Sequence, residues 1–213
     1  MLKRFGLLLC TMLVATAIAQ ADQRPSYRGP VSASEQQFVK NIQADLMKRF
    51  PTVKDAEKAG YFRYTNEDNT GAISYANLQW ASADIQHPSQ LWYDKNGNLL
   101  GADFSVPYKS GDPRPNLFGV NPGRWYEFDD HIHWVTTAND KSAFDNYVYP
   151  GPFKAAGGDP AHPTAQTLVK MNKVKSASEV THVFDMPGIW DLIVWVRPNP
   201  NGAFAYKNPN VKP

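Results

Sequence analysis

The run from residue 189 to residue 196 constrains the fold more than any other part of the chain, because it is apolar at nearly every position. A strand that is apolar on both sides belongs in the middle of a sheet whose two faces are both covered. Asp191 is a lone carboxylate within this run, so it needs a partner if it is buried. We therefore expect a domain built around a β-sheet, with residues 189–196 near its centre.

The N-terminal part of this domain has a helical pattern. Ser34 is a good N-cap, and apolar residues follow at intervals of four from Phe38 to Leu46, which predicts a helix that Pro51 ends. Residues 53–59 predict a second, short helix.

The rest of the chain alternates between extended segments and turns. Asn96-Gly97 between two extended runs is typical of a β-hairpin. Residues 168–173 fit either a strand or a short helix. The predicted strands are residues 62–64, 73–80, 91–93, 99–106, 124–135, 180–184 and 189–196. The predicted fold class is α+β, with N-terminal helices packed on a mostly antiparallel β-sheet in a single globular domain, residues 34–213.

The start of the chain has the three parts of a secretory signal peptide, residues 1–21. Lys3 and Arg4 supply the charged region, the next residues up to Ile18 are apolar, and Ala19-Gln20-Ala21 supplies the small residues that a signal peptidase needs. The apolar run is shorter than the roughly 20 residues that span a bilayer. We expect cleavage near Ala21, a flexible arm over residues 22–33, a periplasmic or extracellular location and no membrane attachment after cleavage.

Loss of the signal peptide changes the charge and the cysteine content. The chain has 22 basic and 20 acidic residues, and without Lys3 and Arg4 each group numbers 20. A neutral chain has no basic stripe to follow a phosphate backbone, which argues against a nucleic-acid partner. Cys10, the only cysteine, is lost as well. The core alone must then hold the exported domain together, and we treat this domain as a monomer.

The segment Asp129-Asp130-His131-Ile132-His133 is the strongest chemical signal in the sequence. Side chains alternate along a strand, so His131 and His133 point the same way, about 6.5 to 7 Å apart at the backbone. Two imidazoles at that spacing can bind one Zn or Cu ion at about 2.0 to 2.1 Å from each nitrogen. We expect His182 to be the third metal ligand, because its neighbours suggest the interior of another strand.

Two carboxylates are assigned supporting roles at this metal site. Asp129 shares the face of the two histidines, and Asp191 is predicted to orient a ligating histidine through a hydrogen bond. With an open metal position, Asp129 or Glu127 could act as the base in a metal-assisted hydrolysis, for which the sequence indicates no substrate. The alternative is that these histidines only make hydrogen bonds and ion pairs on a solvated face of the sheet.

Aromatic residues support a second, metal-free interpretation. They make up 13% of the chain, and Trp92, Trp125 and Trp134 could line a pocket for a small molecule or a glycan. The opposing interpretation is that these tryptophans pack in the core. A third alternative is a secreted hydrolase of unknown substrate, although the sequence contains no nucleophile elbow, P-loop or dinucleotide fingerprint.

The C-terminal segment carries a distinctive set of motifs. Leu192-Ile193-Val194-Trp195 is followed by Asn199-Pro200-Asn201-Gly202-Ala203-Phe204 and by Asn208-Pro209-Asn210-Val211. This order resembles the tail of a family of small secreted bacterial proteins that end in L-H-x-W-x-W, N-P-x-G-x-F and N-P-x-V. Residues 55–61 and 87–107 are similar to that family's A-x-x-x-G-Y and P-x-x-L-x-Y segments. Because the family has no established activity, the resemblance implies export and no mechanism.

The chain departs from this family's pattern at two positions of chemical interest. The histidine of the tail is replaced by Ile193, and the histidine of a G-x-H-x-x-N-like segment is replaced by Ser74. If those histidines form a site in the family, this chain lacks it. His131 and His133 then form a relocated site, or the chain has no such site.

Overall fold

The structure is a computed structural model that describes residues 29–68, 70–80, 84–109, 111–136 and 146–213. The predicted signal peptide and most of the predicted N-terminal arm lie outside the described residues. Within the described ranges, no helix is both long and apolar enough to cross a membrane.

The first helix, α1 (Ala33–Arg49), begins two residues earlier than the predicted cap implies. Ser32, not Ser34, is the N-cap: its hydroxyl accepts from the Glu35 N–H at 3.2 Å, and the Glu35 carboxylate accepts from the Ser32 N–H at 2.8 Å. This reciprocal capping box satisfies two N–H groups that the first turn leaves without helical partners. Phe38, Ile42 and Leu46 form the buried face, as the apolar spacing predicts.

The second helix, α2 (Val53–Lys58), follows Pro51 and has Thr52 as its N-cap. Gly60 then adopts a φ of +88°, a left-handed conformation that glycine reaches without a steric penalty. Both predicted N-terminal helices are therefore present at the predicted places.

Six antiparallel strands form the larger sheet, in the order β1-β2-β3-β4-β9-β5. Their bounds are β1 (Phe62–Arg63), β2 (Ile73–Ala76), β3 (Gln90–Tyr93), β4 (Leu99–Pro107), β9 (Ile189–Trp195) and β5 (Tyr126–Phe128). β9 lies between β4 and β5, and all seven of its residues are buried, which confirms its predicted place inside a sheet.

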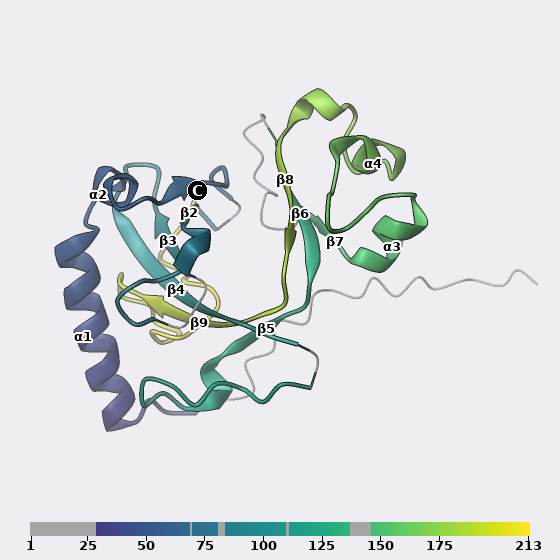
Figure 1. Ribbon diagram of the computed structural model, residues 1–213. Coiled ribbons are helices and arrows are strands. Elements are labelled where there is room, and N and C mark those ends of the chain that lie inside the picture. The colour runs from purple at the N-terminus through teal and green to yellow at the C-terminus, as the bar shows by residue number, and fades with distance from the viewer. Residues whose placement is uncertain (1–28, 69, 81–83, 110, 137–145) are drawn as a thin grey trace, which may run out of the picture.

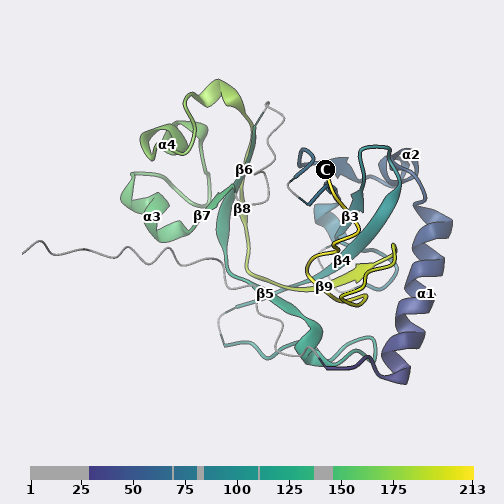
Figure 2. The same cartoon turned by 180° about the vertical axis from the view of Figure 1, so that it is seen from behind.

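Three more strands form a second sheet in the order β7-β6-β8. They are β7 (Tyr147–Val148), β6 (His131–Thr136) and β8 (Val180–Met186). Two short helices, α3 (Pro150–Ala155) and α4 (Ala165–Lys170), pack on the side of this sheet that faces away from the larger one (Figures 1 and 2). Single turns of 3₁₀-helix occupy Leu78–Trp80, Pro122–Arg124 and Ala177–Glu179.

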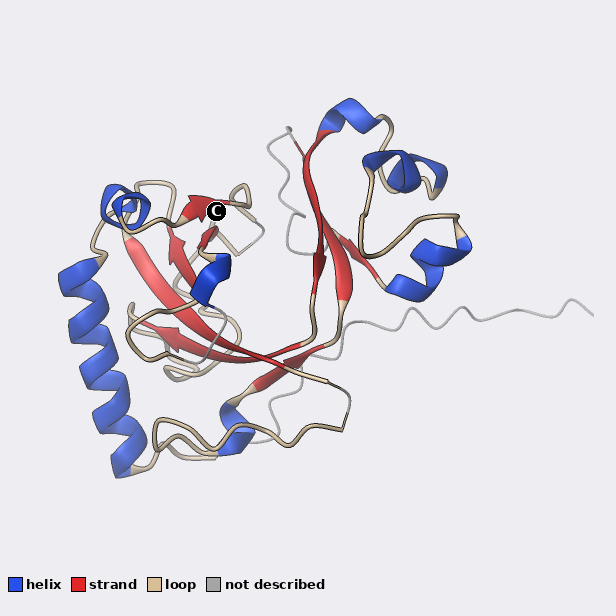
Figure 3. Cartoon of the chain, in the orientation of Figure 1, coloured by secondary structure: helices blue, strands red, loops and turns tan. Residues whose placement is uncertain are grey.

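Two neighbouring segments of the chain cross from one sheet to the other (Figure 3). In one of them β5 leads into β6, and in the other β8 leads into β9. The single strand predicted over residues 124–135 is therefore wrong: it is divided into β5 and β6, which belong to different sheets. The partner strand is interrupted at Pro187-Gly188, because proline lacks an N–H to donate to a ladder. A Cβ on Gly188 would lie 3.1 Å from the Tyr108 carbonyl oxygen, a tight contact that favours glycine here.

Other strand predictions needed smaller corrections. The strand predicted over residues 73–80 ends at Ala76, where Asn77 accepts from the Gln79 N–H at 3.2 Å and starts a 3₁₀ turn. The ambiguous segment at residues 168–173 lies partly in helix α4. The hairpin at Asn96-Gly97 joins β3 and β4 as predicted, with Gly97 at a φ of +78°.

The apolar core lies between helix α1 and one face of the larger sheet. Gln43 of α1 also donates to the Trp195 carbonyl at 2.9 Å, which ties the helix to β9. On the opposite face of the sheet, part of the C-terminal tail packs against Tyr126 and Trp195. The predicted α+β fold, with N-terminal helices on a mostly antiparallel sheet, is confirmed. The main core cluster contains Phe38, Ile42, Leu46, Phe104, Trp125, Leu192 and Val194, among others.

Candidate functional site

Strand β6 divides its side chains between two environments. Ile132 and Trp134 point into the apolar core that helices α3 and α4 cover. His131 and His133 alternate with them and therefore lie on the other face, which turns toward the larger sheet. There the His133 ring lies 6.2 Å from the ring of Tyr64, which follows β1. The H-x-H pattern thus places both imidazoles at the joint between the two sheets.

The two rings are neighbours, with centroids 6.1 Å apart. His131 Nδ1 lies 2.8 Å from the backbone carbonyl oxygen of Asp129. A carbonyl only accepts hydrogen bonds, so Nδ1 carries the hydrogen of the neutral ring and Nε2 presents its lone pair. His133 is 7% exposed, and its Nε2 has no hydrogen-bond partner within the described residues. The buried His133 Nε2 therefore has no described partner, and its ring neighbours a second imidazole.

The surroundings keep both rings neutral. Burial lowers the pKa of His131 from its ordinary value. Burial, together with the neighbouring His131, lowers the pKa of His133 to about 3. Aromatic rings form the walls, since Phe184 lies 5.4 Å from His133 and Tyr147 lies 5.4 Å from His131. The neutral imidazole is the form that binds a metal ion.

The spacing of the two rings can be compared with metal coordination. At ordinary metal–nitrogen distances a ring centroid lies about 3.2 Å from the ion. If Nε2 of both rings pointed at one ion, centroids 6.1 Å apart would correspond to a nitrogen–metal–nitrogen angle of about 145°. This angle is wider than the tetrahedral angle that is usual for zinc.

His182 does not join the pair. It lies on β8 opposite Val135 and is exposed, whereas Phe184 is the β8 residue opposite His133. The register of β8 thus offsets His182 along the strand and places an aromatic ring beside His133. Across the described residues, no group of three or more His, Cys, Asp or Glu side chains could hold a metal ion. The histidine triad expected from the sequence is not assembled.

The two carboxylates expected to support the metal site also lie elsewhere. Asp129 is exposed and orients His131 through its backbone carbonyl, not through its carboxylate. Asp191 lies in β9 of the larger sheet, where the Ser105 hydroxyl donates to it at 3.0 Å. Among the described residues, Asp191 has no hydrogen bond to His131 or His133.

The structure separates the three tryptophans of the aromatic alternative. Trp125 is fully buried in the main core, with its ring 6.0 Å from Phe118. Trp134 is 3% exposed and belongs to the separate core beneath α3 and α4. Trp92 is half-buried against Trp195, at 5.3 Å. Because the three rings pack in different clusters, they do not line one common pocket.

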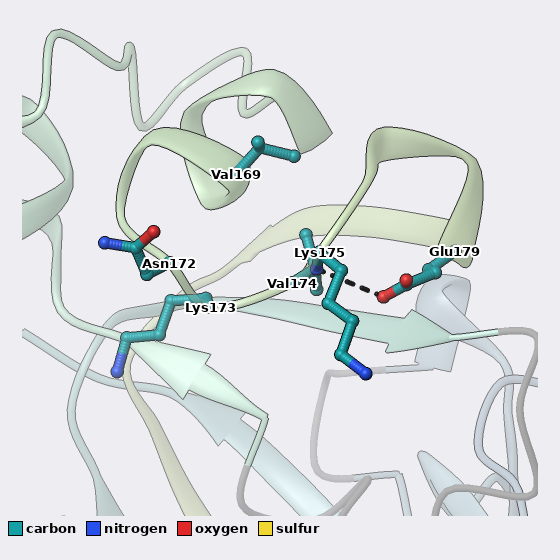
Figure 4. Close-up of a pocket in the computed structure, with 6 residues that line it drawn as sticks. All are labelled: Val169, Asn172, Lys173, Val174, Lys175 and Glu179. Atoms are coloured by element: carbon teal, nitrogen blue, oxygen red, sulfur yellow. Dashed lines mark hydrogen bonds between the residues drawn. The ribbon is translucent and has the colours of Figure 1, made fainter.

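A cavity of about 420 Å³ lies at the end of helix α4 (Figure 4). The Lys175 N–H donates to the Glu179 carboxylate at 3.2 Å, while the side chains of Lys173 and Lys175 diverge. Polar groups that diverge do not fix the orientation of a ligand. The lining residues are Val169, Asn172, Lys173, Val174, Lys175 and Glu179.

One buried polar group, Asp103, was not predicted from the sequence. Asp103 of β4 is 2% exposed and lies on the same face of the larger sheet as Asp191. In the strand predicted over residues 99–106, Asp103 stands between the apolar residues Ala102 and Phe104. This pattern could have indicated a buried carboxylate, as the apolar neighbours of Asp191 do.

When the chain is compared with known proteins, no family model, curated protein or solved structure matches it. The two positions where the resembling family carries histidines can nevertheless be located. Ser74 lies on β2 and Ile193 on β9, both in the larger sheet. His131 and His133 belong to the second sheet, so they occupy a different place in the fold.

Proposed function

We propose that the protein is an exported metal-binding protein that takes one Cu²⁺ or Zn²⁺ ion through Nε2 of His131 and Nε2 of His133. The observation that supports this proposal is the buried Nε2 of His133, which lacks a partner within the described residues and lies beside a second imidazole. The carbonyl of Asp129 holds the hydrogen of His131 on Nδ1, the arrangement that orients metal-binding histidines.

Binding of an ion should lower the free energy of the two histidines. A buried polar atom without a partner costs about 1–3 kcal/mol, and a metal ion bound to the Nε2 lone pair of His133 would remove this cost. Both imidazoles are neutral near pH 7, so no proton has to leave before the ion binds. Imidazole nitrogens suit copper and zinc, and affinity rises toward Cu²⁺ along the first-row series. With two protein ligands, water completes the coordination, and we expect micromolar binding with Cu²⁺ tighter than Zn²⁺.

Calorimetric titration of the purified exported protein with Cu²⁺ and with Zn²⁺ tests the proposal. We expect one ion per chain, and loss of this binding in His131→Ala and in His133→Ala. His182→Ala is the matched control, because it removes an exposed histidine from the neighbouring strand of the same sheet. Equal binding by all four proteins would refute the proposal. Loss of binding in the control would instead restore His182 as a third ligand.

A further inference from the structure

Four oxygen-bearing side chains form a continuous row inside the larger sheet. The Ser89 hydroxyl lies 3.0 Å from Asp103 Oδ1 and 2.6 Å from the Ser105 hydroxyl. The Ser105 hydroxyl lies 3.0 Å from Asp191 Oδ1. All four residues are buried, with exposed fractions between 2% and 6%. The row therefore connects two interior carboxyl groups of neighbouring strands through two hydroxyls.

A count of hydrogens sets the charge of this row. Three oxygen–oxygen contacts each need one hydrogen, and the two serine hydroxyls supply two. The Ser89 hydroxyl is also within 3.1 Å of the Asp103 backbone carbonyl, which increases the shortage. We infer that Asp103 and Asp191 share one proton at neutral pH, and that loss of this proton to alkaline solvent destabilises the centre of the sheet.

The surroundings of the row do not compensate two negative charges. Within the described ranges, neither carboxylate has an ion pair with a lysine, an arginine or a histidine. Burial and the charge of Asp191 raise the pKa of Asp103 well above its ordinary value. Burial likewise raises the pKa of Asp191, to about 7. Two ionised carboxyls in this interior would repel one another without a cation to offset them.

The other polar groups on this face are neutral or already engaged. The Gln90 backbone N–H donates to the Asp103 carboxyl, and the Tyr64 hydroxyl donates to the Gln90 side chain at 2.5 Å. Tyr126, opposite Asp191 on β5, donates to the Phe204 carbonyl at 2.9 Å. Tyr61 is electrostatically coupled to Asp103, while Ser74 and Asp68 lie near Tyr64, and the Asp68 carboxylate accepts from its own loop.

A shared proton links folding to pH with a defined sign. Each carboxyl has a folded-state pKa above its unfolded value, so the stabilisation is complete at acidic pH and is lost as pH rises through the folded pKa. While the folded protein holds one more proton than the unfolded chain, the unfolding equilibrium constant rises about tenfold per pH unit. His133 has the opposite effect below about pH 6.5, so a comparison with a variant is needed to isolate the carboxyl pair.

Asp103→Asn provides that comparison, because its amide can donate to Ser89 in place of the shared proton. We expect the ratio of unfolding constants, wild type to variant, to rise about a hundredfold between about pH 5 and pH 7. Asp112→Asn, which changes an exposed loop carboxylate, is the matched control, and its ratio should not change with pH. A ratio for Asp103→Asn as flat as the control would overturn the inference.

NMR titration of the aspartate carboxyl carbons in the unmodified protein gives a second readout that does not depend on whether the variant folds. We expect at least one aspartate to titrate near neutral pH or above. If every aspartate titrates below about pH 5, the carboxyls do not share a proton and the inference is refuted.

Discussion

Removing one partner of the buried ion pair between Glu35 and Arg124 should destabilise the protein more than most polar substitutions do. Arg124 Nε donates to Glu35 Oε1 at 3.1 Å, and the two side chains are only 8% and 2% exposed. Arg124 Nη2 also donates to the carbonyls of Gly29 and Pro30, at 2.8 and 3.0 Å. One guanidinium therefore joins the start of α1, the segment before it and the turn that leads into β5.

Arg124→Met keeps most of the side-chain volume but removes every one of these donors. Glu35 would then be a buried carboxylate without its cation, and we expect a loss of about 3–5 kcal/mol in the free energy of unfolding. Burial alone raises the pKa of Glu35, but the hydrogen bonds from Arg124, Ser32 and Asn121 together hold it below its ordinary value. The contribution of Glu35 is therefore present above its unfolded pKa and is lost as pH falls through the lower folded value.

Urea denaturation of Arg124→Met, Glu35→Gln and the double variant measures these quantities. We expect the double variant to lose less stability than the sum of the two single variants, because it removes the unpaired charge. The penalty of Arg124→Met should also shrink when the measurement is repeated near pH 3, where Glu35 can be protonated. A loss below about 1 kcal/mol at neutral pH, or strictly additive losses, would refute this reasoning.

Three further predictions concern the fold. Ser32→Ala removes the N-cap of α1 and should cost about 0.5–2 kcal/mol in urea denaturation, whereas Ser34→Ala, the matched control, should cost much less. Leu46→Ala truncates a side chain with no exposed surface and should cost about 2–5 kcal/mol; a loss below 1 kcal/mol would mean that this side chain does not pack as described. Gly71→Ala places a Cβ 2.5 Å from the backbone of Lys212 at a φ of +85°, so it should lower the melting temperature and expose the C-terminal tail to proteolysis, and an unchanged digestion pattern would contradict this contact.

The parts of the fold that the sequence predicted correctly depend on local patterns. The four-residue spacing on α1, the Asn96-Gly97 turn and the apolar run of β9 each determine their own element without reference to distant residues. The division of residues 124–135 between two sheets, in contrast, depends on residues that are distant in the sequence. It follows from the interruption at Pro187-Gly188 in the partner strand, and the pairing of the two segments becomes visible only in the structure.

In the candidate site, too, features within one strand could be predicted from the sequence, and features that depend on strand pairing could not. Alternation along one strand was enough to place His131 and His133 on a common face. The position of His182 depends on the register between β6 and β8, which sequence spacing does not determine. The partner of Asp191 was missed for a related reason, because Ser105 and Asp103 become its neighbours only through the pairing of β4 with β9.

Electron paramagnetic resonance of the protein with one equivalent of Cu²⁺ tests the proposed metal site most directly, because hyperfine couplings report which nitrogens bind the ion. With histidine labelled by a nitrogen isotope, we expect couplings to two imidazoles in the unmodified protein and in His182→Ala. His131→Ala and His133→Ala should each lose this two-imidazole signal. A spectrum that is the same in all four proteins, or one without imidazole couplings, would contradict the proposal that His131 and His133 hold the ion.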